Sequence, residues 1–320
     1  METMQAVVFD GELRYVRDWP RPRVKPGWAL IRVQLAGVCK TDLEIMKGYR
    51  GYRGVLGHEF LGQVESCNDP AWTGKRVVGE INAACGVCDW CARGLGRHCP
   101  DRTTLGIVNH DGCMAGYCAL PVENLHIVDS VISDDRAILT EPLAAACEIL
   151  EQISLTGKER VIVLGDGRLG ILCAWALATA VPDVTLAGHH QEKLAIARWR
   201  DIKFSLRGEG IIPGADLVVD ATGSGKGMSK AMELCRPRGT IVLKSTVALQ
   251  GEINLAPLVI KELTVTGSRC GRFSHALIMM RTFQDMPLNR LITHRFPLHQ
   301  AEQAFAAARS GKALKVVLEL

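Results

Sequence analysis

Residues 161–170 read VIVLGDGRLG, and this stretch decides the fold of the middle of the chain. Its first four residues are a continuous apolar run, which predicts a short buried strand. The overlapping stretch 168–180, RLGILCAWALATA, has the composition of a helix. Glycines at 165, 167 and 170 join the two as G-x-G-x-x-G. Strand, glycine turn and helix in this order indicate one unit of an α/β sheet.

The three glycines allow a tight turn and let the pyrophosphate of a dinucleotide approach the N-terminus of the following helix. In this strand-to-helix context the motif predicts a dinucleotide site, and a glycine turn without a ligand is the alternative. The residues of this loop that we expect at the cofactor are Gly165, Gly167, Arg168, Leu169 and Gly170.

Predicted strands and helices alternate on both sides of this motif. We expect strands at 159–165, 183–188, 215–223 and 239–245, and helices at 168–180, 191–200 and 227–235. Such alternation is typical of a doubly wound parallel sheet. Residues 201–206, DIKFSL, are expected to form the remnant strand of a shortened unit.

The regions before and after this alternating segment have a different sequence pattern. Short apolar runs broken by Gly and Pro predict a β-rich domain, with strands at 6–10, 28–37, 60–66, 75–81, 116–121 and 125–128. A helix is expected at 139–153, and the C-terminal region predicts two helices and a last strand that returns to the first domain. We therefore predict an α/β chain with a β-rich domain over 1–147, a dinucleotide domain over 148–270, and a return over 271–320.

Length and composition exclude several classes of protein. A chain of 320 residues fits two domains, and 48% hydrophobic with 22% charged residues is a globular composition. A net charge of +4 without a basic cluster argues against nucleic-acid binding. The longest apolar run, residues 169–181, is too short to cross a bilayer, and the N-terminus does not resemble a signal peptide. We expect a cytoplasmic protein.

Four cysteines crowd into the stretch CGVCDWCARGLGRHC as C-x2-C-x2-C-x7-C. They are Cys85, Cys88, Cys91 and Cys99. Thiolates at this spacing can close a tetrahedral zinc site with no open position, which makes the site structural. An iron–sulfur cluster is the rival, but that motif has three residues before its last cysteine, where this chain has seven. The remaining eight cysteines are expected to be mostly small buried side chains.

Three shorter segments suggest a second metal site. GVCKTD contains Cys39, GHEF contains His58, and LTEPL contains Glu141. Each residue alone is more often a core residue than a ligand. Together, one thiolate, one imidazole and one carboxylate leave a fourth position open for water or substrate, which is the catalytic arrangement of zinc.

With these motifs in this order, the chain resembles the zinc-dependent medium-chain alcohol dehydrogenases, nearest to their polyol and threonine dehydrogenase branch. The resemblance rests on GVCKTD, GHEF, the cysteine quartet and the glycine loop, and it covers essentially the whole chain. It implies a GroES-like catalytic domain and a Rossmann domain. The implied activity is hydride transfer between a secondary alcohol or polyol and NAD(P), with two zinc ions per chain.

The resemblance also implies roles at the catalytic zinc. Cys39 and His58 match the first two ligands, and Glu141 stands where the family places its third. Glu59, which follows the ligand histidine, can approach or join the zinc shell in the family. Cys147 is a rival for the third position, although we expect it to pack in the core.

Further roles are implied for the residues beside these ligands. Asp42 matches the carboxylate that holds the ligand histidine, Thr41 matches the hydroxyl that relays the substrate proton, and Lys40 stands where relatives can have a basic residue at the pyrophosphate. By family geometry, the segment between Asp42 and His58 borders the substrate site. Its candidate lining residues are Ile45, Met46 and Tyr49.

The second strand of the predicted sheet bears on the choice between NAD and NADP. An NAD site usually has Asp or Glu at the end of this strand, where the carboxylate accepts hydrogen bonds from the ribose. This chain has Gly188 there, followed by His189, His190 and Lys193, and it has Arg168 in the glycine loop. We therefore predict a preference for NADP, and we expect Gly188→Asp to shift it toward NAD. The alternative is that the two histidines are solvated loop residues.

Two other functions remain open from the sequence. One is a non-catalytic NADP(H)-binding or redox-sensing protein on the same fold, and the other is a zinc-independent enone or quinone reductase. The intact set Cys39, His58 and Glu141 argues against both. We expect a small-molecule alcohol or ketone as substrate and a homodimer or homotetramer as the assembly.

Overall fold

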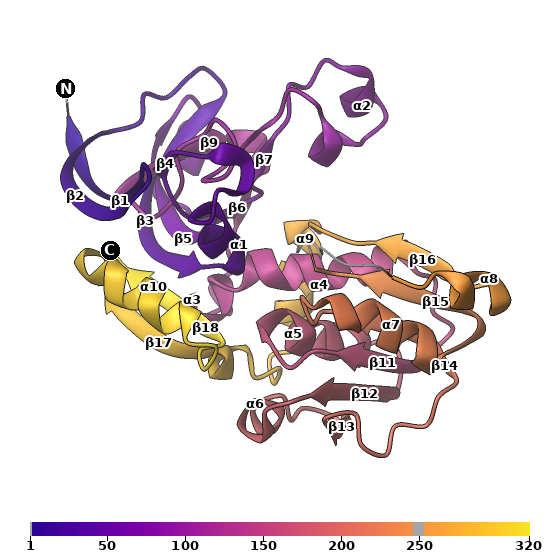
Figure 1. Cartoon of the computed structure of the whole chain (residues 1–320). Coiled ribbons are helices and arrows are strands. Elements are labelled where there is room, and N and C mark those ends of the chain that lie inside the picture. The colour runs from indigo at the N-terminus through magenta and orange to yellow at the C-terminus, as the bar shows by residue number, and fades with distance from the viewer. Residues whose placement is uncertain (1, 246–252) are drawn as a thin grey trace. The chain divides into compact units, whose positions relative to one another are not determined.

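The computed structural model describes residues 2–245 and 253–320 (Figure 1). The chain divides into two compact units, which we call the first and the second unit. The first comprises Met1–Glu141, Leu277–Gln284 and Leu288–Leu320, and the second comprises Pro142–Ala276 and Asp285–Pro287. The sequence predicted the two boundaries after residues 147 and 270, whereas the structure has them after residues 141 and 276.

The first unit contains two main sheets. The smaller has the strand order β2-β1-β4, and the larger has the order β10-β6-β5-β3-β18-β17, with β9 also paired to β3. The strands of the smaller sheet are β1 (Thr3–Phe9), β2 (Leu13–Pro20) and β4 (Gly54–Val55). Those of the larger are β3 (Trp28–Val38), β5 (Glu59–Cys67), β6 (Arg76–Gly79), β9 (Tyr117–Pro121), β10 (Leu125–Ile127), β17 (Ile292–Pro297) and β18 (Lys315–Glu319).

The last strand returns to the first unit, as the sequence indicated. β18 pairs antiparallel with β3, in the register Val316↔Val38 to Glu319↔Leu35. On its other edge β3 pairs with β5, and Gly37 lies opposite Glu59. β3 therefore brings the last strand of the chain and the strand that follows His58 into one sheet.

The second unit is built on a six-stranded sheet in which every pairing is parallel. Its order is β13-β12-β11-β14-β15-β16. This confirms the predicted doubly wound sheet of α/β class. The strands are β11 (Arg160–Leu164), β12 (Asp183–Gly188), β13 (Lys203–Leu206), β14 (Ala215–Asp220), β15 (Cys235–Leu243) and β16 (Thr264–Gly267).

Helices connect the strands of this sheet (Figure 1). The helix after β11 is apolar on every side, and its residues from Gly170 to Leu177 are all buried. This burial explains the continuous apolar run that the sequence shows there. The helices in this part of the chain are α4 (Thr140–Gln152), α5 (Arg168–Leu177), α6 (Gln191–Ile196), α7 (Gly225–Leu234), α8 (Ala256–Ile260) and α9 (Phe273–Thr282).

Several details differ from the sequence prediction. The shortened unit is present as β13, and residues 207–214, all of which the structure describes, contain no helix before β14. α8 and the edge strand β16 were not predicted, and neither were β2 and β17. The remaining elements belong to the first unit and are α1 (Lys40–Ile45), α2 (Asp89–Ala92), α3 (Asp134–Ala137), α10 (Ala301–Arg309), β7 (Asn82–Ala83) and β8 (Thr103–Thr104).

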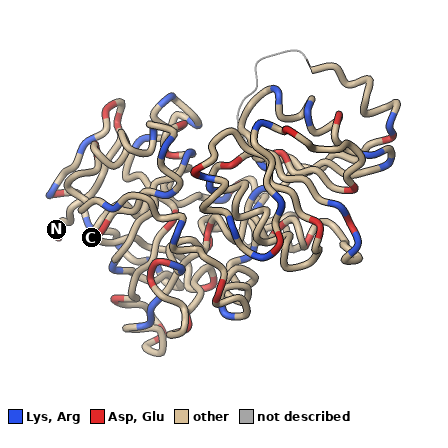
Figure 2. Tube along the Cα trace, turned by 90° about the horizontal axis from the view of Figure 1, so that it is seen from below, with Lys and Arg blue, Asp and Glu red and all other residues tan. Residues whose placement is uncertain are grey.

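Charged residues are spread over the chain rather than gathered by sign. Figure 2 shows Lys and Arg interspersed with Asp and Glu along the trace. Within residues 2–245 and 253–320, no helix has the length and apolar character needed to cross a bilayer.

Candidate functional site

The first candidate metal group starts where β3 ends. Cys39 is the N-cap residue of α1 in an extended conformation, so its side chain stands at the beginning of the helix. The backbone N–H of Cys39 donates to Oδ2 of Asp42 at 2.8 Å, which closes the first turn of α1. The thiol and the carboxylate are thereby held in one rigid turn.

Asp42 also holds His58. Its second carboxylate oxygen, Oδ1, lies 3.3 Å from Nδ1 of His58, and both side chains are buried. A carboxylate at Nδ1 orients the ring and leaves Nε2 for another partner, as in metal sites where histidine is held by an acid. Burial by itself lowers the pKa of His58, but Asp42 and Cys39 outweigh it and the pKa is raised well above its usual value. The surroundings of the ring therefore favour positive charge.

Glu59 completes the group. One ligand atom from each of Cys39, His58 and Glu59 lies within 4.8 Å of the others. Thiolate, imidazole and carboxylate are zinc donors, and three protein ligands leave one position open. These donors, with His58 and Glu59 buried and Cys39 half-buried, fit a zinc ion of the catalytic kind.

Glu141, which sequence analysis assigned as the third ligand, is not in this group, although the structure describes it. It lies half-buried in the first turn of α4. Glu59 falls in this group because it follows His58 directly and sits opposite Gly37, close to the end of β3. The rival Cys147 is buried in α4 and is also outside the group.

Sequence reasoning missed one partner of this group, Lys315. Its side chain is fully buried and forms an ion pair with Glu59. Burial lowers the pKa of Lys315 to about 8, although the charges of Cys39 and Asp42 oppose the shift. No local sequence pattern identifies Lys315 as part of this group, because its ion-pair partner Glu59 lies in a distant part of the sequence.

The other residues predicted near this group have different surroundings. Thr41 Oγ1 lies 3.8 Å from Cys39 Sγ, within reach of a ligand at the thiolate. Lys40 is exposed at the first position of α1. Ile45 is fully buried and offers no open surface, Met46 Sδ lies 3.9 Å from Arg309 Nη1, and Tyr49 is 39% exposed. Their roles at cofactor and substrate stay predictions.

The cysteine quartet forms the second metal group. The sulfur atoms of all four residues lie within 4.8 Å of one another. The separations are 3.9 Å for Cys85–Cys91, 3.5 Å for Cys88–Cys91 and 3.7 Å for Cys88–Cys99. A zinc–sulfur bond of about 2.3 Å implies sulfur atoms about 3.8 Å apart in a tetrahedron. The quartet therefore fits one zinc ion, whereas thiolates bound to different irons of a cluster stand farther apart.

Backbone hydrogen bonds to Cys85 favour the thiolate form, which is the form that binds a metal ion. Cys88 is the N-cap of α2, and Figure 1 shows this short helix in a loop that leaves the sheets of the first unit. Hydrogen bonds from the backbone N–H groups of Val87 and Cys88 lower the pKa of Cys85 to about 7. The loop thus stabilises at least one thiolate by itself.

In the second unit, the glycine loop has the geometry that the motif predicts. Gly165 has φ +112° and lies against the backbone of Ala221, so a side chain there would be strained and crowded. A Cβ at Gly170 would overlap the carbonyl oxygen of Gly165. Gly167 is the N-cap of α5 and is exposed, and Arg168 and Leu169 form the first positions of the helix. The loop presents an open helix N-terminus, which fits a pyrophosphate.

The end of β12 differs from the prediction. Asp166 of the glycine loop is buried beside Gly188, and a Cβ at position 188 would overlap its carboxylate. Its Oδ2 accepts from the backbone N–H groups of His189 and His190, each at 2.6 Å. The space that we expected Gly188 to leave for a phosphate is therefore filled by an acid. Lys193, a predicted cofactor residue, is buried in α6.

Comparison with known proteins identifies the family of the chain. The alcohol dehydrogenase GroES-like domain matches residues 25–130, and the glucose dehydrogenase C-terminus matches residues 134–320. Erythritol/L-threitol dehydrogenase of Mycolicibacterium smegmatis is 30% identical, over 97% of this chain and 96% of its own. D-altritol 5-dehydrogenase of Agrobacterium fabrum is 28% identical, with 97% of each chain covered.

A solved structure has the same fold over nearly the whole chain. A crystal structure from E. coli CFT073, described as a short chain alcohol dehydrogenase complexed with NADH, is 25% identical. It covers 99% of each chain with a TM-score of 0.89. These matches span both units, the two metal groups and the glycine loop. The chain therefore belongs to the zinc-dependent medium-chain alcohol dehydrogenase family, alongside the polyol dehydrogenases.

Proposed function

We propose that this chain is a zinc-dependent dehydrogenase that transfers a hydride between a polyol or other secondary alcohol and a nicotinamide dinucleotide. The observation that carries the proposal is the group Cys39, His58 and Glu59, held by Asp42, in a chain that also has an open dinucleotide loop. Relatives named for erythritol, threitol and altritol favour a substrate with several hydroxyl groups.

Each residue of the first group has a proposed task. Cys39, His58 and Glu59 would hold one zinc ion, and Asp42 would keep the imidazole of His58 turned toward it. When bound, zinc supplies a Lewis acid that lowers the pKa of an alcohol oxygen, and the nicotinamide accepts the hydride. Thr41 Oγ1 is proposed to take the proton that leaves the substrate hydroxyl.

We assign the third ligand position to Glu59 instead of Glu141. The assignment is supported by the 4.8 Å grouping of Glu59 with Cys39 and His58. Glu59→Gln should then cost more zinc affinity than Glu141→Gln. Equal losses in the two variants would mean that both carboxylates take part.

Three further parts of the proposal concern the whole protein. The quartet Cys85, Cys88, Cys91 and Cys99 would hold a second, structural zinc ion. The assembly is proposed to be a homodimer or homotetramer, since most soluble oligomers are symmetric. The proposed location is the cytoplasm.

The predicted NADP preference loses its main premise, because Asp166 lies beside Gly188.

The proposal is tested by following nicotinamide absorbance with NAD and NADP against a panel of tetritols, hexitols and simple secondary alcohols. We expect reduction of the cofactor with at least one polyol and no turnover by Cys39→Ala. That variant should keep its fold and the zinc of the quartet. Turnover by Cys39→Ala would support a zinc-independent reductase, and cofactor binding without any turnover would support a binding or sensing protein.

A further inference from the structure

Asp166 is a buried acid in the glycine loop. It occupies the first variable position of the G-x-G-x-x-G motif, between Gly165 and Gly167, and it is 7% exposed. The carboxylate lies against Gly188, the last residue of β12. An acid at the end of this second strand normally accepts hydrogen bonds from the adenosine ribose of NAD. Here the strand itself ends in glycine and the acid comes from the loop.

The side chain of Asp166 and a side chain at position 188 cannot be accommodated together. A Cβ at Gly188 would overlap Cβ, Cγ and Oδ2 of Asp166. Only glycine at 188 leaves room for the carboxylate at 166. The missing acid at the strand end and the extra acid in the loop are therefore one structural arrangement.

The carboxylate is fixed but retains an acceptor site. Oδ2 accepts from the backbone N–H groups of His189 and His190 at 2.6 Å, and Nδ1 of His190 lies 3.1 Å from Oδ2 and 3.2 Å from Oδ1. An ionised carboxylate offers about four lone-pair sites. The long contact with His190 is the one polar contact of Oδ1 within the described residues. Oδ1 thus has capacity for a hydroxyl group.

We propose that Asp166 is the acid that accepts the ribose hydroxyl of the dinucleotide and repels a 2′-phosphate, so that the chain selects NAD(H) over NADP(H). This inference rests on the proposed function and deepens it. Hydrogen bonds to a charged acceptor are among the stronger ones in proteins, and a phosphate beside a carboxylate meets like charge. Asp166 would discriminate between NAD(H) and NADP(H) without an acid at the C-terminal end of β12.

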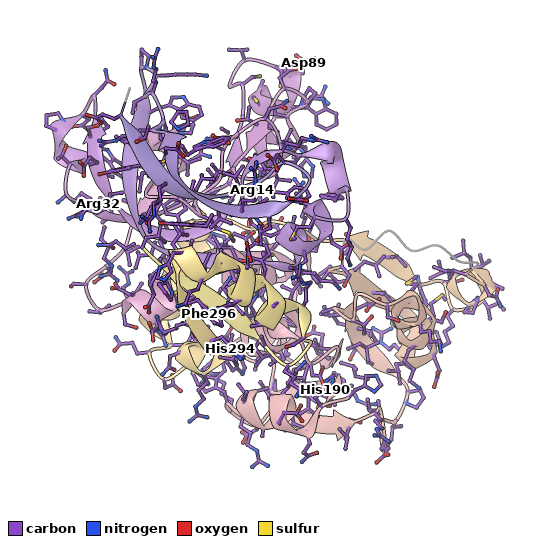
Figure 3. The ribbon with its side chains drawn as sticks, turned by 60° about the vertical axis from the view of Figure 1, so that its left-hand side comes forward. Arg14, Arg32, Asp89, His190, His294 and Phe296 are labelled. Atoms are coloured by element: carbon purple, nitrogen blue, oxygen red, sulfur yellow. The ribbon has the colours of Figure 1, made fainter. Side chains whose placement is uncertain are left out.

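Several basic residues lie close to Gly188 in the chain or in the sheet. His190, which Figure 3 labels near α6, is already directed at Asp166. Lys193 is buried and His189 is exposed. Arg207, exposed after β13, donates its backbone N–H to the carbonyl oxygen of Gly188 at 2.6 Å.

The test measures binding of NADH and NADPH separately, by nicotinamide fluorescence and calorimetry without substrate. The wild-type protein should bind NADH at least about tenfold more tightly than NADPH. Asp166→Asn should reduce that ratio by about tenfold or more, because it removes the charge and keeps the size. Asp183→Asn is the matched control. It removes one charge at the opposite end of β12, where Asp183 pairs with Lys203, and should leave the ratio unchanged.

A second variant keeps the inference testable if Asp166→Asn does not fold. The double variant Asp166→Ser, Gly188→Asp moves the carboxylate to the strand end and should bind NADH preferentially. Gly188→Asp alone should weaken both cofactors, because its side chain collides with Asp166. This replaces our sequence-based expectation of a simple shift toward NAD.

The possible outcomes separate this inference from the proposed function. Wild-type protein that binds NADPH as tightly as NADH overturns the role of Asp166 and leaves the dehydrogenase proposal intact. A ratio unchanged by Asp166→Asn, with both cofactors weakened equally, means that Asp166 only shapes the loop and also overturns the inference. Binding of neither dinucleotide overturns the proposed function itself.

Discussion

Lys315 and Glu59 form an ion pair in which neither side chain exposes any surface. Lys315 begins β18 and Glu59 begins β5, and these strands lie on the two edges of β3. A charge buried in this way is tolerated only with its counter-charge. The pair therefore ties the last strand of the chain to the residue that follows His58.

We expect Lys315→Met to destabilise the protein by about 3–5 kcal/mol, because it leaves the Glu59 charge buried without its partner. Denaturant unfolding measures the change. Lys312→Met, at an exposed position of the same region, is the control and should change stability by less than about 0.5 kcal/mol. The double variant Lys315→Met, Glu59→Gln should recover part of the loss. A loss below 1 kcal/mol in the single variant would show that the pair is not buried in solution.

Asp42→Asn should weaken zinc binding at the first group without unfolding the protein. The amide has one oxygen in place of the two that contact Cys39 N–H and His58 Nδ1. Loss of such a supporting carboxylate typically costs about 10- to 100-fold in metal affinity. Competition with a chelator measures it. Glu44→Gln, in the same helix and in an exposed pair with Lys47, should behave as wild type.

The two metal groups should be separable by counting metal per chain with mass spectrometry. We expect two zinc ions in the wild-type protein and one each in Cys39→Ala and Cys88→Ser. Cys67→Ala, a cysteine outside both groups, should retain two. Iron in place of zinc at the quartet, or a visible absorbance band, would contradict the structural zinc site.

Glu159 should contribute a pH-dependent term to stability. Its carboxylate accepts from Thr156 N and Oγ1 at 2.8 and 2.7 Å, and hydrogen bonds from Thr156 lower its pKa from 4.5 to about 2. A pKa that is lower in the folded state adds stability above pH 4.5, and this is lost as the pH falls toward 2. Glu159→Gln should therefore be less stable than wild type at pH 7, with the difference shrinking between pH 4.5 and 2.

Thr156→Val provides the check on this assignment. It removes the hydroxyl donor but keeps the backbone N–H, so it should reproduce part of the effect of Glu159→Gln in the same pH range. A stability difference that stays constant from pH 7 to pH 2 would show that Glu159 is not held in its charged form by these hydrogen bonds.

Much of the fold and site could be predicted from the sequence, because the deciding features are local. Apolar runs and helix patterns around residues 161–170 indicated the parallel sheet, and the glycine positions indicated the loop. The spacing from Cys85 to Cys99 predicted a single tetrahedral site because the short turns between these residues bring the sulfur atoms together. Edge strands such as β16 and β17 were missed, since their burial patterns are weak and their pairing is decided by distant strands.

The sequence by itself determined which donor residues are available and that Cys39 and His58 belong to one metal group. Only the tertiary structure decided that a carboxylate oxygen of Glu59 lies within 4.8 Å of the donor atoms of Cys39 and His58, because the pairing of β3 with β5 sets that distance. It also decided that Lys315 neutralises Glu59 and that Asp166 fills the space beside Gly188. Such relationships join residues far apart along the chain. Their distances depend on strand register and side-chain packing, which no local pattern encodes.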